Sequence, residues 1–254
     1  MKPFALADFT AYAASIPEAL DAAQASTVFT ARDTILVKPN LVNASPFPVT
    51  THPDSCRAVL AYIRDHAPRS RLIIADGCGD PRAETPELFT RLGFLSIARE
   101  FGAELLDLND APLTLIERPD LAFFKTIRLP SILLESCVVS LAVLKAHSLA
   151  GYSGVLKNMM GVLPPLYYAQ RHGFWRKAAL HADLQRAISE LCAVARPDVS
   201  VLDASVGLRD HHLGGRECDP PLGKIIAGSD PWEVDRFGAG LLGMDWRTIE
   251  HLRG

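Results

Sequence analysis

At least five short apolar runs in this 254-residue chain end in polar, glycine-bearing loops, and most of them alternate with helical patterns. Such alternation predicts an α/β fold built on a doubly wound, mostly parallel sheet with helices on both faces. We therefore expect a three-layer, Rossmann-like sandwich formed by a single α/β domain over residues 1–254. The expected strands cover residues 34–37, 71–75, 104–108, 137–143, 199–202 and 224–227.

The polar residues that follow these strands form the first candidate site. In open α/β sheets, ligands bind beyond the carboxyl ends of the strands. Loops that lie far apart in the sequence should therefore meet at one edge of the sheet. The residues expected there are Lys38, Asn40, Asp76, Lys145, His147, Asp203 and Asp230. Ion pairs between these lysines and aspartates are the structural alternative, although buried pairs carry a desolvation cost.

Residues 144–161, LKAHSLAGYSGVLKNMMG, concentrate lysine, histidine, asparagine and glycine directly behind an apolar strand. If a helix begins near Tyr152, its otherwise apolar surface contains one narrow polar stripe. The stripe consists of Gly154, Lys157, Asn158 and Gly161. This pattern predicts a buried helix that faces a ligand. A core helix whose lysine snorkels to the surface is the alternative.

The same helix gives a reason to expect an anion. Free N–H groups and the positive dipole end after Ser153 would attract negative charge, and Lys38, Lys145 and Lys157 could add three cations. The whole chain, in contrast, has 26 basic and 29 acidic residues and a formal charge of -3. Neither nucleic acid nor an anionic membrane is therefore an expected partner. We predict a local site for a small carboxylate or phosphate ligand.

Standard cofactor motifs do not explain the chain. The segment GYSGVLK does not match the phosphate-binding loop, and DGCGDPR places Arg82 where the dinucleotide fingerprint requires glycine, so the cofactor stays unknown. The five cysteines are scattered without a C-x-x-C pair, which argues against disulfides, zinc and iron–sulfur motifs and favours a reducing compartment. The sequence also indicates neither a signal peptide nor a membrane span, so we expect a cytoplasmic protein.

Histidines support a different chemistry. Two imidazoles and one carboxylate could bind a metal, with His147 and His52 joined by Asp76 or Asp203. A lone histidine in a loop is more often a surface hydrogen-bonding group, and we assign no metal ligand. Lys145 and His147 could instead act as base and acid, since burial or neighbouring cations lower the pKa of a lysine. Six of the eight histidines enter these considerations: His52, His147, His172, His181, His211 and His212.

The segment 163–179, LPPLYYAQRHGFWRKAA, is aromatic and basic. It is too apolar for a solvated tether and is more typical of a lid or an interface loop. Closure over a substrate, burial in a homodimer and ordinary core packing all remain open for its aromatic side chains.

Several motifs together resemble a known family. The runs ILVKPNLV, THPDSCRAVLAYIRD, IIADGCG, VVSLAVLKAHSLAGYSGVLKNMMGVLP, DASVGL and IIAGSDPWEVDRFGAGLLG are similar, in order, to the family called domain of unknown function 362. The resemblance implies a prokaryotic, cytoplasmic α/β protein without an assigned activity. Many relatives contain a ferredoxin-like four-cysteine module, which this sequence lacks, and Ala146 replaces the threonine usual between lysine and histidine. The residues that match the family motifs are Lys38, Pro39, Asn40, His52, Asp76, Lys145, His147, Lys157 and Asn158.

Three classes of function are compatible with these observations. The first is an enzyme that acts on a small anionic ligand, with Lys145 and His147 as catalytic residues. Its expected ligand-binding residues are Lys38, Asn40, His52, Asp76, Lys157, Asn158, Asp203 and Asp230. The second is a metal- or iron–sulfur-linked redox or cofactor-maturation protein that works with a separate ferredoxin-like electron carrier. The third is a ligand-binding module without chemistry.

Overall fold

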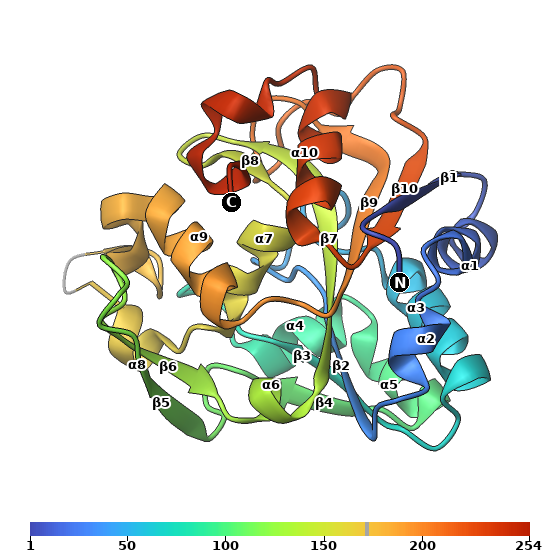
Figure 1. The fold of residues 1–254 in the computed structure, drawn as a ribbon, viewed down its shortest axis with the longest axis horizontal. Helices are drawn as coiled ribbons and strands as arrows, with labels where there is room; N and C mark the ends of the chain where they lie inside the picture. Colours follow the sequence, from blue (N-terminus) through green and yellow to red (C-terminus); the bar gives the residue numbers. More distant parts are fainter. Residues whose placement is uncertain (171–172) are drawn as a thin grey trace.

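The computed structural model describes residues 1–170 and 173–254. Within them, an eight-stranded sheet has the order β1-β10-β9-β7-β2-β3-β4, with β8 paired to β7 (Figure 1). A separate two-stranded sheet joins β5 and β6. The strands are β1 (Ala5–Asp8), β2 (Thr34–Lys38), β3 (Arg71–Asp76), β4 (Glu104–Asp107), β5 (Leu113–Glu117), β6 (Thr126–Pro130), β7 (Cys137–His147), β8 (Gly151–Ser153), β9 (Val199–Leu208) and β10 (Lys224–Gly228).

The centre of the large sheet is parallel. Strands β9, β7, β2, β3 and β4 run in the same direction, whereas β10 is antiparallel to β9 and to β1. The prediction of a mostly parallel sheet is therefore confirmed. The strand expected at residues 224–227 is present as β10, but it runs the opposite way. Its carboxyl end consequently lies at the other edge of the sheet from the ends of the parallel strands.

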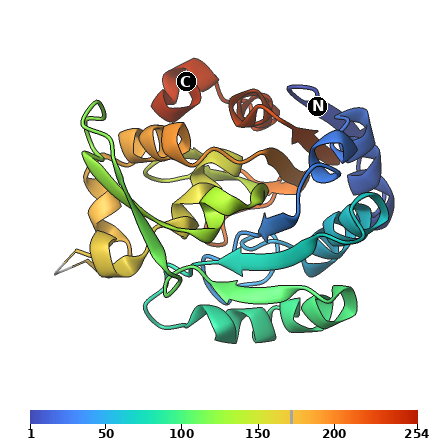
Figure 2. The same ribbon diagram turned by 60° about the horizontal axis from the view of Figure 1, so that its bottom comes forward.

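Helices cover both faces of the sheet, which confirms the doubly wound, three-layer α/β sandwich (Figure 2). One face carries α1 (Tyr12–Ala22), α2 (Ser26–Phe29), α3 (Pro53–His66), α4 (Thr85–Arg91) and α5 (Phe94–Phe101). The other face carries α6 (Ile132–Glu135), α7 (Val155–Asn158), α9 (Leu184–Val194) and α10 (Pro231–Leu241), and α8 (Pro165–Tyr168) packs at its margin. Short 3-10 helices occupy Met159–Val162, Ala178–Asp183, Trp246–Thr248 and Glu250–Leu252.

The local sequence explains the central elements. Ile35 and Val37 of β2 enter one hydrophobic core and Leu36 enters the other, as the two-residue period of a strand requires. Every residue of β7 is buried, which is typical of a central parallel strand with helices on both faces. No helix within the two described stretches has the length and apolar character needed to cross a bilayer.

Candidate functional site

A cavity of about 280 Å³ lies at the carboxyl ends of the parallel strands. It is lined by Lys38 at the end of β2, Asp76 at the end of β3 and His147 at the end of β7. The segment 157–161, the loop after β9 and the segment 175–184 contribute further lining residues. Strands β3 and β4 lie on one side of β2, and β7 and β9 on the other, so the cavity is at the topological switch point of the sheet. Ligands bind at this position in open α/β sheets.

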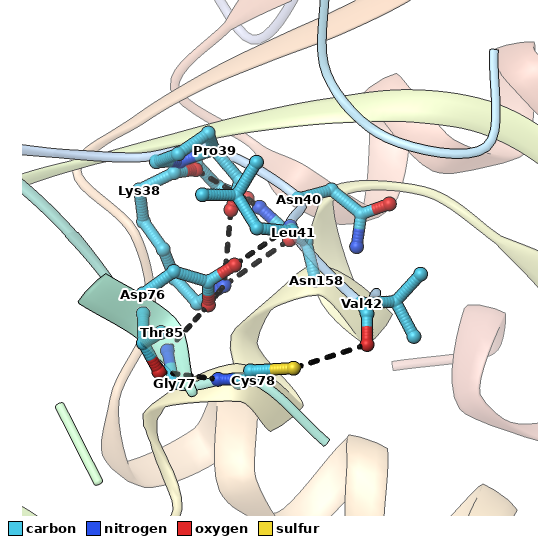
Figure 3. Close-up of polar contacts among 12 residues, drawn as sticks. Lys38, Pro39, Asn40, Leu41, Val42, Asp76, Gly77, Cys78, Thr85 and Asn158 are labelled. Atoms are coloured by element: carbon cyan, nitrogen blue, oxygen red, sulfur yellow. Dashed lines mark hydrogen bonds and ion pairs between the residues drawn. The ribbon is translucent and has the colours of Figure 1, made fainter. Parts of the chain in front are cut away.

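Lys38 and Asp76 form a buried ion pair at the floor of the cavity. The Lys38 Nζ lies 2.6 Å from the Asp76 Oδ1, and the two side chains are 1% and 4% exposed. The backbone N–H of Leu41 donates to Oδ2 at 2.7 Å, and that of Gly77 donates to Oδ1 at 2.8 Å (Figure 3). Burial lowers the pKa of Lys38, and the negative charge of Asp76 opposes that shift. Asp76 thus balances the charge of Lys38.

Asn158 positions Lys38 from the opposite side. Its Oδ1 accepts a hydrogen bond from the Lys38 Nζ at 3.2 Å, and its Nδ2 donates to the Lys38 carbonyl at 3.1 Å and to the Ser140 Oγ at 3.0 Å. Gly161 permits this arrangement, because a Cβ at that position would lie 2.5 Å from the Lys38 Nζ. Asn158 and Gly161 therefore shape the cation site, and Asn158 also lines the cavity.

Lys177 is a cavity residue that the sequence analysis did not identify. Its Nζ donates to the carbonyl of Gly77 at 2.8 Å and to that of Gly161 at 2.7 Å. These bonds attach the C-terminal part of the aromatic segment 163–179 to the floor of the cavity. Burial lowers the pKa of Lys177 to about 7. The only sequence signal for it was the basic character of residues 163–179.

Lys157 lines the cavity without a protein partner among the described residues. The side chain is partly exposed at the cavity. Its pKa is lowered to about 8, first by burial and then by the positive charge of Lys38. An ammonium group in this position lacks the compensating carboxylate that Lys38 has.

Lys145 lies behind the cavity and not among its lining residues. Its Nζ donates to the Asn40 Oδ1 at 2.5 Å and to the Val49 carbonyl at 2.7 Å. Burial, followed by the charge of Lys157, lowers its pKa to about 7. The amide of Asn40 does line the cavity, so Lys145 acts on the site through Asn40 and through its charge.

His147 is held as a neutral hydrogen-bond donor. Its Nδ1 accepts from the backbone N–H groups of Leu149 and Ala150, both at 3.1 Å, so the proton of the neutral ring is on Nε2. The ring stacks on His212 with centroids 3.7 Å apart. Burial, then the charge of Lys157, lowers the pKa of His147 far below its ordinary value. Burial likewise lowers the pKa of His212 to about 3.

The remaining histidines separate into two groups. His181 and His211 line the cavity with His147 and His212, and His172 lies outside the described residues. His52 is elsewhere: its Nδ1 accepts from the Asp54 N–H at 3.1 Å at the start of α3, and its ring stacks on Tyr12. The expected pairing of His52 with His147 is therefore wrong. Across residues 1–170 and 173–254, no three histidine, cysteine, aspartate or glutamate side chains are grouped to bind a metal ion.

The expected helix start near Tyr152 is also wrong, because Gly151–Ser153 pairs with β7 as strand β8 and α7 begins at Val155. The N-terminus of α7 does not offer free N–H groups to a ligand. Asp235 of α10 accepts from the N–H groups of Val155 at 2.8 Å and Leu156 at 2.9 Å, and from the Tyr152 hydroxyl at 3.2 Å. A protein carboxylate thus occupies the site that the sequence suggested for an external anion.

Asp235 gives a pH-dependent prediction. Burial raises the pKa of Asp235 from 3.8 to about 7, so the native state binds its proton more tightly than the unfolded state does. The free energy of unfolding should therefore fall as the pH rises from 4 to 7. In the Asp235→Asn variant this contribution, up to about 1.4 kcal/mol per unit of pKa difference, should disappear. Urea unfolding of both proteins across this range measures the difference. An unchanged pH slope would contradict the prediction, and the exposed Asp110→Asn variant serves as the control.

Two further expected site residues, besides His52 and Lys145, are not among the residues that line the cavity. Asp203 is buried and its Oδ1 accepts from the Ser205 N–H at 2.9 Å and hydroxyl at 2.6 Å. Asp230 caps α10, accepting from the Trp232 and Glu233 N–H groups at 2.9 and 3.2 Å. Because Asp230 follows the antiparallel β10, it is at the opposite edge of the sheet. The structure therefore places neither residue with the lysines.

Fold and site together define a doubly wound α/β protein with a lysine- and histidine-lined cavity at its switch point. The family described as Domain of unknown function (DUF362) matches residues 35–240, and the chain belongs to this family. The matched region includes every lysine of the site. The comparison with curated proteins gives no match.

Proposed function

We propose that this DUF362 protein is an enzyme that acts on a small anionic substrate, bearing a carboxylate or phosphate group, in the lysine-lined cavity. One observation carries the proposal: Lys38, Lys157 and Lys177 line a cavity in which Asp76 is the only carboxylate among the described lining residues. Cationic groups fixed in a partly desolvated site stabilise negative charge far better than they would in water.

The cavity has more cationic than anionic side chains, which favours the binding of an anion. Asp76 neutralises Lys38, whereas Lys157 and Lys177 have no carboxylate partner among the described residues. Burial lowers the pKa of both of these amines. A bound anion would restore their ordinary protonation by supplying the missing negative charge. The proposed ligand is therefore bound most tightly as a carboxylate or phosphate in contact with Lys157 and Lys177.

The other groups suit recognition of a polar ligand. The neutral His147 ring offers its Nε2–H as a donor, and the Asn40 amide is fixed by Lys145. The volume of about 280 Å³ is just below the range for small-molecule sites, roughly 300–1,000 Å³. These features favour a small metabolite over a nucleotide or a polymer.

Binding of oxalate and inorganic phosphate tests this proposal. We expect either anion to raise the thermal midpoint of the wild type in a saturable manner. The Lys157→Met variant should bind at least about ten-fold more weakly, a loss of about 1.4 kcal/mol, because it removes one unpaired cation. The exposed Lys125→Met variant has the same charge change away from the cavity and should bind as the wild type does. Equal affinities in both variants would refute the assignment.

Turnover separates an enzyme from a binding module. A ligand recovered from the purified protein and identified by mass spectrometry can be returned to the protein in excess. Its conversion by the wild type, and not by Lys157→Met, supports catalysis. Stable binding without conversion would assign the cavity to sensing or delivery.

A further inference from the structure

The three cavity lysines differ in what their ammonium groups contact. Lys38 is committed to Asp76 at 2.6 Å, and Lys177 donates to two backbone carbonyls. Lys157 makes no hydrogen bond or ion pair with any residue in the described ranges, and its side chain reaches the cavity. Lys157 is thus the cavity lysine whose nitrogen is available to react.

The surroundings of Lys157 favour its neutral, nucleophilic form. Burial is the main cause that lowers its pKa to about 8, and the charge of Lys38 adds to it. An amine that is desolvated or placed beside another cation becomes a nucleophile near neutral pH. The titratable groups that its charge reaches are Lys38, Lys145, His147, His181, His212 and His251.

We propose that Lys157 forms a covalent imine with the carbonyl carbon of a small 2-oxo carboxylate. This inference rests on the proposed function, because the cavity must first bind the carboxylate. Lys177 lines the cavity and has no carboxylate partner among the described residues, so its charge is available to that carboxylate, and the adjacent carbonyl group can then face the free Lys157 nitrogen. The His147 Nε2–H is a neutral donor suited to polarise a carbonyl oxygen.

The step balances without an added oxidant, reductant or cofactor. The lone pair of the neutral Lys157 amine forms the C–N bond, and the carbonyl C=O bond is converted to a hydroxyl group in the carbinolamine. Loss of that hydroxyl, together with the remaining amine hydrogen, gives the imine and one water molecule. The protonated imine withdraws electrons from the adjacent carbon C3, which makes removal of a proton from C3 easier and gives an enamine.

Reductive trapping tests the inference. The wild-type protein is incubated with pyruvate and sodium cyanoborohydride, digested and mapped by mass spectrometry. We expect the mass of one reductively coupled pyruvate on Lys157 at a rate at least about ten-fold above that on the exposed Lys125, corresponding to about 1.4 kcal/mol. Oxalate, which resembles pyruvate but has no ketone, should protect Lys157 and leave Lys125 unaffected.

The Lys157→Arg variant is the matched control, since it keeps the positive charge but cannot form the imine. It should bind oxalate and show no trapped adduct at position 157 or elsewhere in the cavity. Oxalate binding by the wild type with Lys157 labelled no faster than Lys125 would overturn the imine and leave the proposed function intact. Failure of both oxalate binding and selective labelling would overturn both.

Discussion

Replacing Asp76 with alanine should lower the free energy of unfolding by about 3–5 kcal/mol, because it leaves a buried lysine charge without its partner. The Lys38 and Asp76 side chains are 1% and 4% exposed, so water cannot replace the lost carboxylate. The substitution also leaves the N–H groups of Leu41 and Gly77 without their acceptor. Urea unfolding at neutral pH measures the loss.

Two further variants show whether the charge causes this loss. Asp120→Ala breaks an ion pair with Arg118 in which the aspartate is 60% exposed, and it should cost at most about 1 kcal/mol. The double variant Lys38→Met, Asp76→Leu removes both charges and should be more stable than Asp76→Ala alone. If the double variant is less stable than the single one, packing and not unpaired charge determines the cost.

The sequence correctly predicted the site residues that directly follow parallel strands. Lys38, Asp76 and His147 each follow an apolar run, and parallel strands place such ends at the same edge. The structure brings these three residues together at the cavity. Strand and loop alternation was sufficient for this part, because it determines which ends of the strands share an edge.

The sequence could not show which strands run antiparallel. The short run at residues 224–227 is as apolar as the parallel strands, but it hydrogen-bonds to β9 in the opposite direction. Mixed sheets, in which antiparallel strands extend a parallel centre, are common, and the sequence of such a strand does not mark its direction. The sequence analysis therefore assigned Asp230 to the wrong edge of the sheet. In the structure it lies at the opposite edge, where it caps α10.

The sequence also could not predict contacts between segments that are far apart in the chain. Lys177 joins the site through carbonyls of Gly77 and Gly161, which carry no side-chain signal. Asp235 reaches the N-terminus of α7 across 80 residues of sequence. A possible signal for Asp235 was an acidic residue on the buried face of an apolar helix, since such a group requires partners.

Replacing Lys157 with methionine should make the ligand-free protein more stable, by about 1–3 kcal/mol. The native state contains an ammonium group without a protein partner among the described residues, and methionine has a similar length without the charge. Partial exposure of the side chain keeps the gain below the value for a fully buried charge. The same substitution should weaken anion binding, so stability and ligand binding should change in opposite directions.

The pH dependence identifies the charge as the cause. The pKa of Lys157 falls from 10.5 to about 8 on folding, so its penalty is complete below pH 8 and disappears as pH rises toward 10.5. The stability advantage of Lys157→Met over the wild type should be constant below pH 8 and should shrink between pH 8 and 10.5. Urea unfolding of the two proteins and of Lys125→Met measures these differences. A Lys157→Met protein less stable than the wild type at pH 7 would mean that the ammonium group stabilises the ligand-free fold, and the unpaired cation would then no longer support an anion site.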